Sequence, residues 1–210
     1  MKIQPIVEGH GEVEAVPILL RRLMAQAGAY SLDIGRPIRQ SRSQLLNEAS
    51  LKKALRLALK QPDCGAVLVL FDSDRDCPLE LAPRIESWAR DEAGPVPCAV
   101  VMAHKEFEAW FLAAVESLRG KCGVRTDAGS HPSPEDVRGA KGRLEDLMAP
   151  GRSYMETSDQ AKLAAAFDMG AAYAKCRSFR KMISAFGVLA RASGGSLDEW
   201  PPAAWARGRE

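Results

Sequence analysis

The sequence predicts an α/β protein: a mostly parallel four-stranded sheet with helices on both faces, followed by a helical C-terminal region. Two observations support this fold class. Residues 66–71 read A-V-L-V-L-F, an unbroken apolar run typical of a strand buried on both faces of a parallel sheet. Over residues 1–118, patterns typical of strands and of helices alternate, as they do when helices connect parallel strands. We therefore divide the chain into an α/β core over residues 1–118 and a helical extension over residues 119–210 that packs on this core.

The first predicted unit is a strand, a glycine turn and a helix. Residues 2–7 read K-I-Q-P-I-V, a strand pattern in which Pro5 indicates a position near an edge or a bulge. Gly9 and Gly11 then allow a tight turn. Apolar residues recur at helical spacing over residues 12–27, which predicts the first helix.

The core continues with a polar second strand. Residues 33–40 contain Arg36, Pro37 and Arg39, and Arg42 follows them. A proline and several charged residues favour an edge strand. After it, the patterns predict a helix over 47–60, the buried strand already described, a helix over 78–92, a strand over 97–103 and a helix over 104–118.

The extension begins with a loop of low hydrophobicity over residues 120–133. Helical patterns then follow, and the predicted helices span 134–148, 158–169 and 178–192. Thr157 or Ser158 is expected to cap the second of them.

Composition excludes several protein classes. The chain has 210 residues, is 46% hydrophobic and 27% charged, and carries a net charge of +2. No apolar run approaches the roughly 20 residues of a membrane span, so we expect no membrane association and a cytoplasmic location. The five cysteines are scattered without a C-x-x-C pair, which suggests neither a disulfide framework nor a zinc site.

Acidic residues gather where the predicted strands end. They are, in chain order, Glu8, Glu12, Asp72, Asp74, Asp76 and Glu108. The carboxyl ends of parallel strands meet at one edge of a sheet, so these side chains are expected to lie close together. Like charges at this spacing repel one another unless a cation lies between them. An oxygen-only set of ligands suits Mg²⁺ or Mn²⁺, and two such ions about 4 Å apart can clamp a phosphodiester.

The last predicted core helix, residues 104–118, carries two acids in its first turn. Helical geometry places Glu108 on the buried flank beside the sheet, whereas Glu106 points well away from it. Only Glu108 is therefore included with the acids of the sheet edge.

In this order of elements, two motifs resemble the Toprim domain, which is shared by topoisomerases, bacterial primases, recombination-associated proteins and OLD-family nucleases. They are V-E-G-H-G-E over residues 7–12 and F-D-S-D-R-D over residues 71–76. K-E-F-E over residues 105–108, followed by Trp110, is similar to a run in the OLD-like branch. The similarity is closest to small bacterial Toprim-like proteins, and it covers residues 1–118.

The resemblance implies roles for the acids. Glu8 would be a metal ligand and a general base or acid, and Glu12 a ligand of a second ion. Asp72 and Asp74 would be the main metal-binding pair and Glu108 a further ligand. Asp76 is at most an accessory group.

OLD-like nucleases also use a lysine that stabilises charge on the phosphate. Lys162 is our candidate for this catalytic role beside Glu8, Asp72 and Asp74. Lys141 and Lys105 are possible accessory residues.

The implied function is a Mg²⁺- or Mn²⁺-dependent nuclease acting on DNA or RNA, within a phage-defence module. No G-x-x-x-x-G-K-[ST] motif occurs in these 210 residues, so an ATPase would be a separate subunit. A homodimer is also compatible with the resemblance.

Two alternatives remain open. A phosphatase with an aspartyl nucleophile also uses a D-x-D motif. The chain could instead be a module that binds metal or nucleic acid without cleavage and acts through a partner. Basic residues of the extension would then dock that partner, namely Lys175, Arg177, Arg180 and Lys181.

Overall fold

A parallel sheet forms the centre of the protein. The computed structural model describes residues 1–206, and in it the strand order is β2-β1-β4-β5, with β3 also paired to β1. The described pairings within this sheet are parallel, in agreement with the mostly parallel sheet that was predicted. The strands are β1 (Lys2–Val7), β2 (Asp33–Ile34), β3 (Ile38–Arg39), β4 (Cys64–Asp72) and β5 (Cys98–Ala103). The predicted polar edge strand is thus present as two short pieces, β2 and β3, interrupted before Ile38 by Pro37, which has no N–H to donate.

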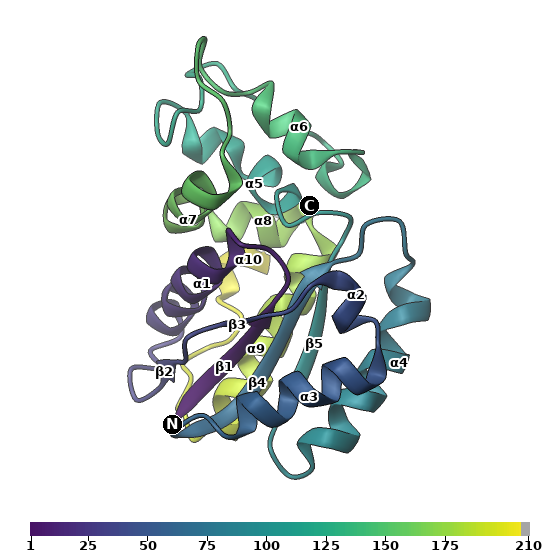
Figure 1. Cartoon of the computed structure of the whole chain (residues 1–210). Coiled ribbons are helices and arrows are strands. Elements are labelled where there is room, and N and C mark those ends of the chain that lie inside the picture. The colour runs from purple at the N-terminus through teal and green to yellow at the C-terminus, as the bar shows by residue number, and fades with distance from the viewer. Residues whose placement is uncertain (207–210) are drawn as a thin grey trace.

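Helices cover both faces of the sheet, as the fold class requires (Figure 1). Side chains of β4 alternate between two apolar clusters, so that Leu68 and Leu70 face one side and Val69 and Phe71 face the other. The first side is covered by α1 (Glu12–Gln26) and α9 (Arg177–Ala192), and the second by α3 (Glu48–Leu59) and α4 (Pro78–Ala93). The short helix α2 (Arg42–Leu45) leads from β3 into α3.

Residues 109–175 form a helical cap over the carboxyl end of the sheet (Figure 1). Its elements are α5 (Ala109–Ala113), the 3₁₀ helices η1 (Val115–Leu118) and η2 (Pro134–Asp136), α6 (Ala140–Glu145), α7 (Glu156–Ala166) and α8 (Met169–Lys175). Aromatic rings join the cap to α9, because Trp110 packs on Phe179 with ring centroids 5.0 Å apart. After α9, the chain ends its described part in α10 (Ala203–Ala206).

For the first strand, Pro5 predicted a position near an edge or a bulge. Strand β1 is not at an edge, because β4 lies on one side of it and β2 and β3 on the other, but its register does shift between Lys2 and Ile3. The helix predicted over residues 104–118 is wrong in its first turn. The chain turns sharply at Lys105, whose φ is 61°, and the Phe107 N–H donates to Asp72 Oδ1 instead of joining a helix.

The predicted helices of the extension are broken in two places. The helix expected over 134–148 is interrupted at Gly139, whose φ of 69° no continuous helix allows. The helix expected over 158–169 begins earlier, after Met155, and α8 then starts anew because the Asp168 side chain caps the N–H groups of Gly170 and Ala171. Thr157 and Ser158 therefore lie inside α7 and do not cap it. No helix within residues 1–206 is long and apolar enough to cross a membrane.

Candidate functional site

The turn after β1 brings two of the predicted acids together. Glu8 follows the last residue of β1, and Glu12 opens α1 one turn later. The Glu12 carboxylate accepts the N–H groups of Glu8 at 2.9 Å and Gly9 at 3.1 Å, so it folds back over the turn. Glu12 is almost fully buried and Glu8 is half-buried.

Two further acids reach the same place from β4 and from the turn after β5. Asp72 ends β4 and accepts the Phe107 N–H at 2.8 Å through Oδ1, while its own N–H donates to Glu8 Oε2 at 3.3 Å. Glu108 comes directly after Phe107 in the chain and is fully buried. We call Glu8, Glu12, Asp72 and Glu108 the carboxylate cluster.

The electrostatics of the carboxylate cluster show that its members face one another. Burial, together with the nearby carboxylates of Glu8 and Glu108, raises the pKa of Glu12 from 4.5 to about 7, even though two N–H donors oppose this rise. Burial and the charges of Glu12 and Glu108 raise the pKa of Asp72 well above its usual value. Burial also raises the pKa values of Glu8 and Glu108. The group is therefore one of mutually repelling acids removed from water.

The cap supplies a second set of polar groups over the carboxylate cluster, and sequence analysis did not single out most of them. Glu108 Oε1 accepts the Tyr154 hydroxyl at 2.8 Å and the Gln160 amide at 3.1 Å. The Lys141 ammonium pairs with Glu156 at 2.8 Å. Burial opposes the charge on Lys141, but the carboxylates of Glu108, Glu156 and Asp72 outweigh it and raise its pKa.

Helix α7 can approach the turn after β1 only because that turn carries glycines. A Cβ atom on Gly11 would lie 2.6 Å from both Gln160 Oε1 and the Glu156 carbonyl oxygen, and one on Gly9 would lie 3.0 Å from Glu156 Oε1. The two glycines predicted to form a tight turn therefore also make room for the cap.

Asp74 and Asp76 lie in a different environment. Residues 73–76, which we call the acid loop, are bound by Arg42 of α2. Arg42 pairs with Asp74 at 3.2 Å and with Asp76 at 2.5 Å, and it also donates to the carbonyl oxygens of Asp72 and Ser73. Asp74 is exposed and adopts a φ of 50°. Its charge still acts on Glu8, where it contributes to the raised pKa.

The other predicted lysines point elsewhere. The Lys162 ammonium pairs with Asp159 at 3.1 Å, and Arg152 shares the same carboxylate at 2.7 Å. The Lys105 ammonium donates to the carbonyl oxygen of Asp136.

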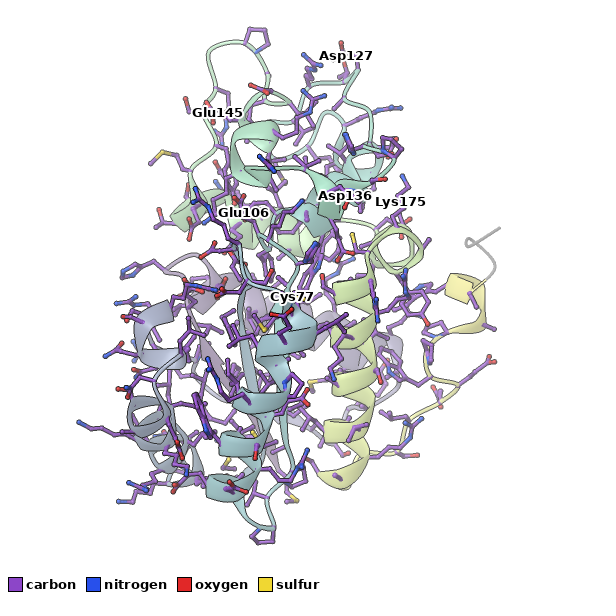
Figure 2. The ribbon with its side chains drawn as sticks, turned by 90° about the vertical axis from the view of Figure 1, so that its right-hand side faces the viewer. Cys77, Glu106, Asp127, Asp136, Glu145 and Lys175 are labelled. Atoms are coloured by element: carbon purple, nitrogen blue, oxygen red, sulfur yellow. The ribbon has the colours of Figure 1, made fainter. Side chains whose placement is uncertain are left out.

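Figure 2 shows Glu106 and Cys77 at the level where the cap meets the sheet, with Glu145 and Asp127 farther out on the cap. Glu106 itself accepts the Lys141 N–H at 2.7 Å.

The donor chemistry of the carboxylate cluster fits a hard divalent cation. Carboxylate and amide oxygens are the ligands that Mg²⁺ and Mn²⁺ prefer, and two buried oxygens, Glu108 Oε2 and Gln160 Oε1, have no hydrogen-bond partner. The carboxylates of Glu8, Glu12 and Asp72 are instead turned toward backbone N–H groups, whereas Glu108 accepts hydrogen bonds from side chains of the cap. In residues 1–206, no three His, Cys, Asp or Glu side chains are arranged to hold a metal ion. Binding one would require the acids to turn from those N–H groups toward a common point.

The fold and the site together define an α/β protein with buried carboxylates at the carboxyl edge of a parallel sheet, closed by a helical cap. The chain belongs to the family described as domain of unknown function (DUF4276), which matches residues 7–186. The match contains the whole carboxylate cluster and the whole cap. No curated protein and no solved structure is significantly similar to the chain.

Proposed function

We propose that this chain is a Mg²⁺- or Mn²⁺-dependent phosphodiester hydrolase that acts on DNA or RNA. The observation that carries the proposal is the carboxylate cluster, in which Glu12, Asp72 and Glu108 are at most 8% exposed and the charge of Glu108 raises the pKa values of both Glu12 and Asp72. Burying several like charges is costly, and such arrangements are concentrated at functional sites. The resemblance of the same residues to a Toprim domain supports the same reaction class.

Glu12, Asp72 and Glu108 would hold the cation, and Asp74 could join them after separating from Arg42. When bound, a divalent ion would act as a Lewis acid toward an oxygen of the phosphodiester. Tyr154 and Gln160 would keep Glu108 oriented through their hydrogen bonds to Oε1, leaving Oε2 for the ion.

Glu8 and Lys141 would supply the remaining chemistry. Glu8 is half-buried and its pKa is raised by burial, so its carboxylate suits accepting a proton from an attacking water molecule. Lys141 stays protonated because nearby carboxylates raise its pKa, and its charge would stabilise the charge that builds on the phosphate. Lys162 suits this role less well, because it pairs with Asp159, whereas Lys141 acts on Asp72 and Glu108 themselves.

The phosphatase alternative receives less support. An aspartyl nucleophile must reach its substrate, whereas Asp72 is 8% exposed and has one oxygen bound to the Phe107 N–H. It would also leave the burial of Glu12 and Glu108 without a role. A non-cleaving module would show metal or nucleic-acid binding without turnover, which the following experiment distinguishes.

The test compares two glutamates of α1. The purified chain is incubated with Mn²⁺ or Mg²⁺ and plasmid DNA, single-stranded DNA or RNA. Glu12→Gln should abolish cleavage, whereas Glu14→Gln, an exposed glutamate two residues away, should cleave at the rate of the unsubstituted chain. Intact substrates under all these conditions, with the unsubstituted chain folded, would exclude autonomous hydrolysis.

The same proposal includes a cytoplasmic location, a place in a phage-defence module, and a separate ATPase subunit as partner. A homodimer remains a further prediction of this kind. If cleavage requires the ATPase, the glutamate comparison applies unchanged to the reconstituted mixture.

A further inference from the structure

A cationic side chain lies at the rim of the carboxylate cluster, and no carboxylate of residues 1–206 forms an ion pair with it. Arg39 ends β3 and pairs in register with Val7, the residue before Glu8. Its guanidinium donates to the Glu8 carbonyl oxygen at 3.4 Å, and its side chain is otherwise exposed. This places a positive charge directly beside the turn that carries Glu8 and Glu12.

The neighbouring arginines of the same segment differ in how they are used. Arg42 is bound by two carboxylates and two carbonyl oxygens of the sheet edge, so its charge and its donors are occupied. Arg36 is exposed and, within residues 1–206, neither it nor Arg39 forms an ion pair. On the opposite side of the carboxylate cluster, Lys141 is paired with Glu156. Of these four cationic residues, the two without an ion pair therefore lie on the β3 side.

Arg36 and Arg39 lie along the free edge of the sheet. Ile34 pairs with Ile3 and Ile38 with Ile6, so Arg36 lies beside the middle of β1 and Arg39 beside its end. Three extended residues separate their Cα atoms by at most about 10 Å. The two residues thus follow one another along the sheet edge and lead away from the site, which suits a chain of phosphates better than one isolated anion.

We propose that Arg36 and Arg39 bind the phosphate backbone of a nucleic-acid strand that approaches the candidate site along the β2–β3 edge. The proposal rests on the proposed function for the identity of the polyanion. Guanidinium groups match phosphate geometry with paired N–H donors. The carboxylate cluster repels phosphate, so a substrate strand needs positive contacts beside it, and these two arginines provide them before the reacting phosphate reaches the acids.

The test measures binding without hydrolysis. Fluorescence anisotropy of labelled single-stranded and duplex oligonucleotides is recorded with EDTA over a range of salt concentrations. Replacing Arg39 or Arg36 by Ala should each lower the salt slope of log Kobs by about 0.7 to 0.9, and weaken binding roughly tenfold at about 50 mM salt. Arg39→Lys keeps the charge and should keep the slope.

Arg90→Ala is the matched control. Arg90 is also exposed and forms no ion pair in the described part of the chain, but it lies in the last turn of α4, at the opposite edge of the sheet. It should bind like the unsubstituted chain. An unchanged slope in the Arg36→Ala/Arg39→Ala double variant, or no binding by the unsubstituted chain, would overturn the proposal.

The outcome is separable from that of the proposed function. A chain that binds through Arg36 and Arg39 but never cleaves with Mn²⁺ would retain this inference and lose the hydrolase. A chain that cleaves, but whose binding is unchanged when both arginines are replaced, would retain the hydrolase and lose this inference.

Discussion

The carboxylate cluster and the acid loop lie at the same edge of the sheet, yet their charges are balanced in opposite ways. The acid loop already has its cation, because Arg42 pairs with Asp74 and Asp76. The carboxylate cluster has Lys141 and Arg42 acting on it from nearby, but both are already paired with other carboxylates, Lys141 with Glu156 and Arg42 with the acid loop. Both acids of the acid loop are thus paired with an arginine, whereas within residues 1–206 no ion pair involves the four acids of the carboxylate cluster. We therefore expect an incoming cation to bind first at the carboxylate cluster.

The largest expected effect separates the two groups by activity. Asp72→Asn removes a charge of the carboxylate cluster and should lower the rate of hydrolysis by about 10²- to 10³-fold. Asp76→Asn removes a charge that Arg42 already balances and should change the rate by less than about threefold. Initial rates on the substrate that the unsubstituted chain cleaves provide the measurement. Equal losses in both variants would contradict the distinction between the groups.

The lysines sharpen the same comparison. Lys141→Ala should lower the rate about 10²-fold, because it removes an ammonium whose charge acts on both Asp72 and Glu108. Lys162→Ala should have little effect, because its partner is Asp159. The reverse order of effects would restore Lys162 as the catalytic lysine.

The stability of the metal-free chain should report the unbalanced charge. Glu12 has a pKa of 4.5 when unfolded and about 7 when folded, so the unfolded state releases a proton first as the pH rises. Without divalent ions, the contribution of Glu12 to the free energy of unfolding should therefore fall between about pH 4.5 and pH 7, by up to about 3 kcal/mol, and Glu8, Asp72 and Glu108 should add falls of the same sign. Urea unfolding in EDTA measures this fall.

Glu12→Gln is the control for that experiment. It should flatten the pH dependence and be more stable than the unsubstituted chain above about pH 7 in EDTA, since it removes a repelled charge. Added Mn²⁺ should stabilise the unsubstituted chain more than the variant. A steeper fall in the variant would show that Glu12 is not the repelled group.

The smallest expected effect concerns the acid loop. Arg42→Ala leaves two backbone carbonyl oxygens and two half-exposed carboxylates without their donor, and should cost about 2 kcal/mol in the free energy of unfolding. Arg39→Ala should cost less than about 0.5 kcal/mol, because that side chain makes one long hydrogen bond. Denaturant midpoints of both variants test the difference.

Part of this site could be predicted from the sequence. Glu8, Asp72 and Glu108 follow strands of a parallel sheet, and the geometry of such a sheet brings their positions to one edge. The helix expected over residues 104–118 failed because Asp72 captures the Phe107 N–H, a contact between residues far apart in the chain that no local pattern reveals.

The contribution of the cap could not be predicted. Tyr154 and Gln160 meet Glu108 only after α7 docks on the glycine turn, and their sequence surroundings resemble an ordinary helix start. The pairing of Arg42 with the acid loop could not be predicted from the sequence for the same reason. Motifs indicated which acids gather, whereas the balance of charge depended on tertiary contacts.

Helix α9 has a consequence for how the protein is made. It covers the face of the sheet that carries Leu68 and Leu70, although the whole cap separates it from β5 in the chain. During synthesis, β1, β4 and β5 leave the ribosome well before α9. The apolar face with Leu68 and Leu70 therefore stays uncovered until α9 has been made. A fragment of residues 1–118 contains all four acids of the carboxylate cluster, but we expect it to aggregate through that face. The last third of the chain, which contains α9, is therefore needed to cover the apolar face of the sheet and complete the fold.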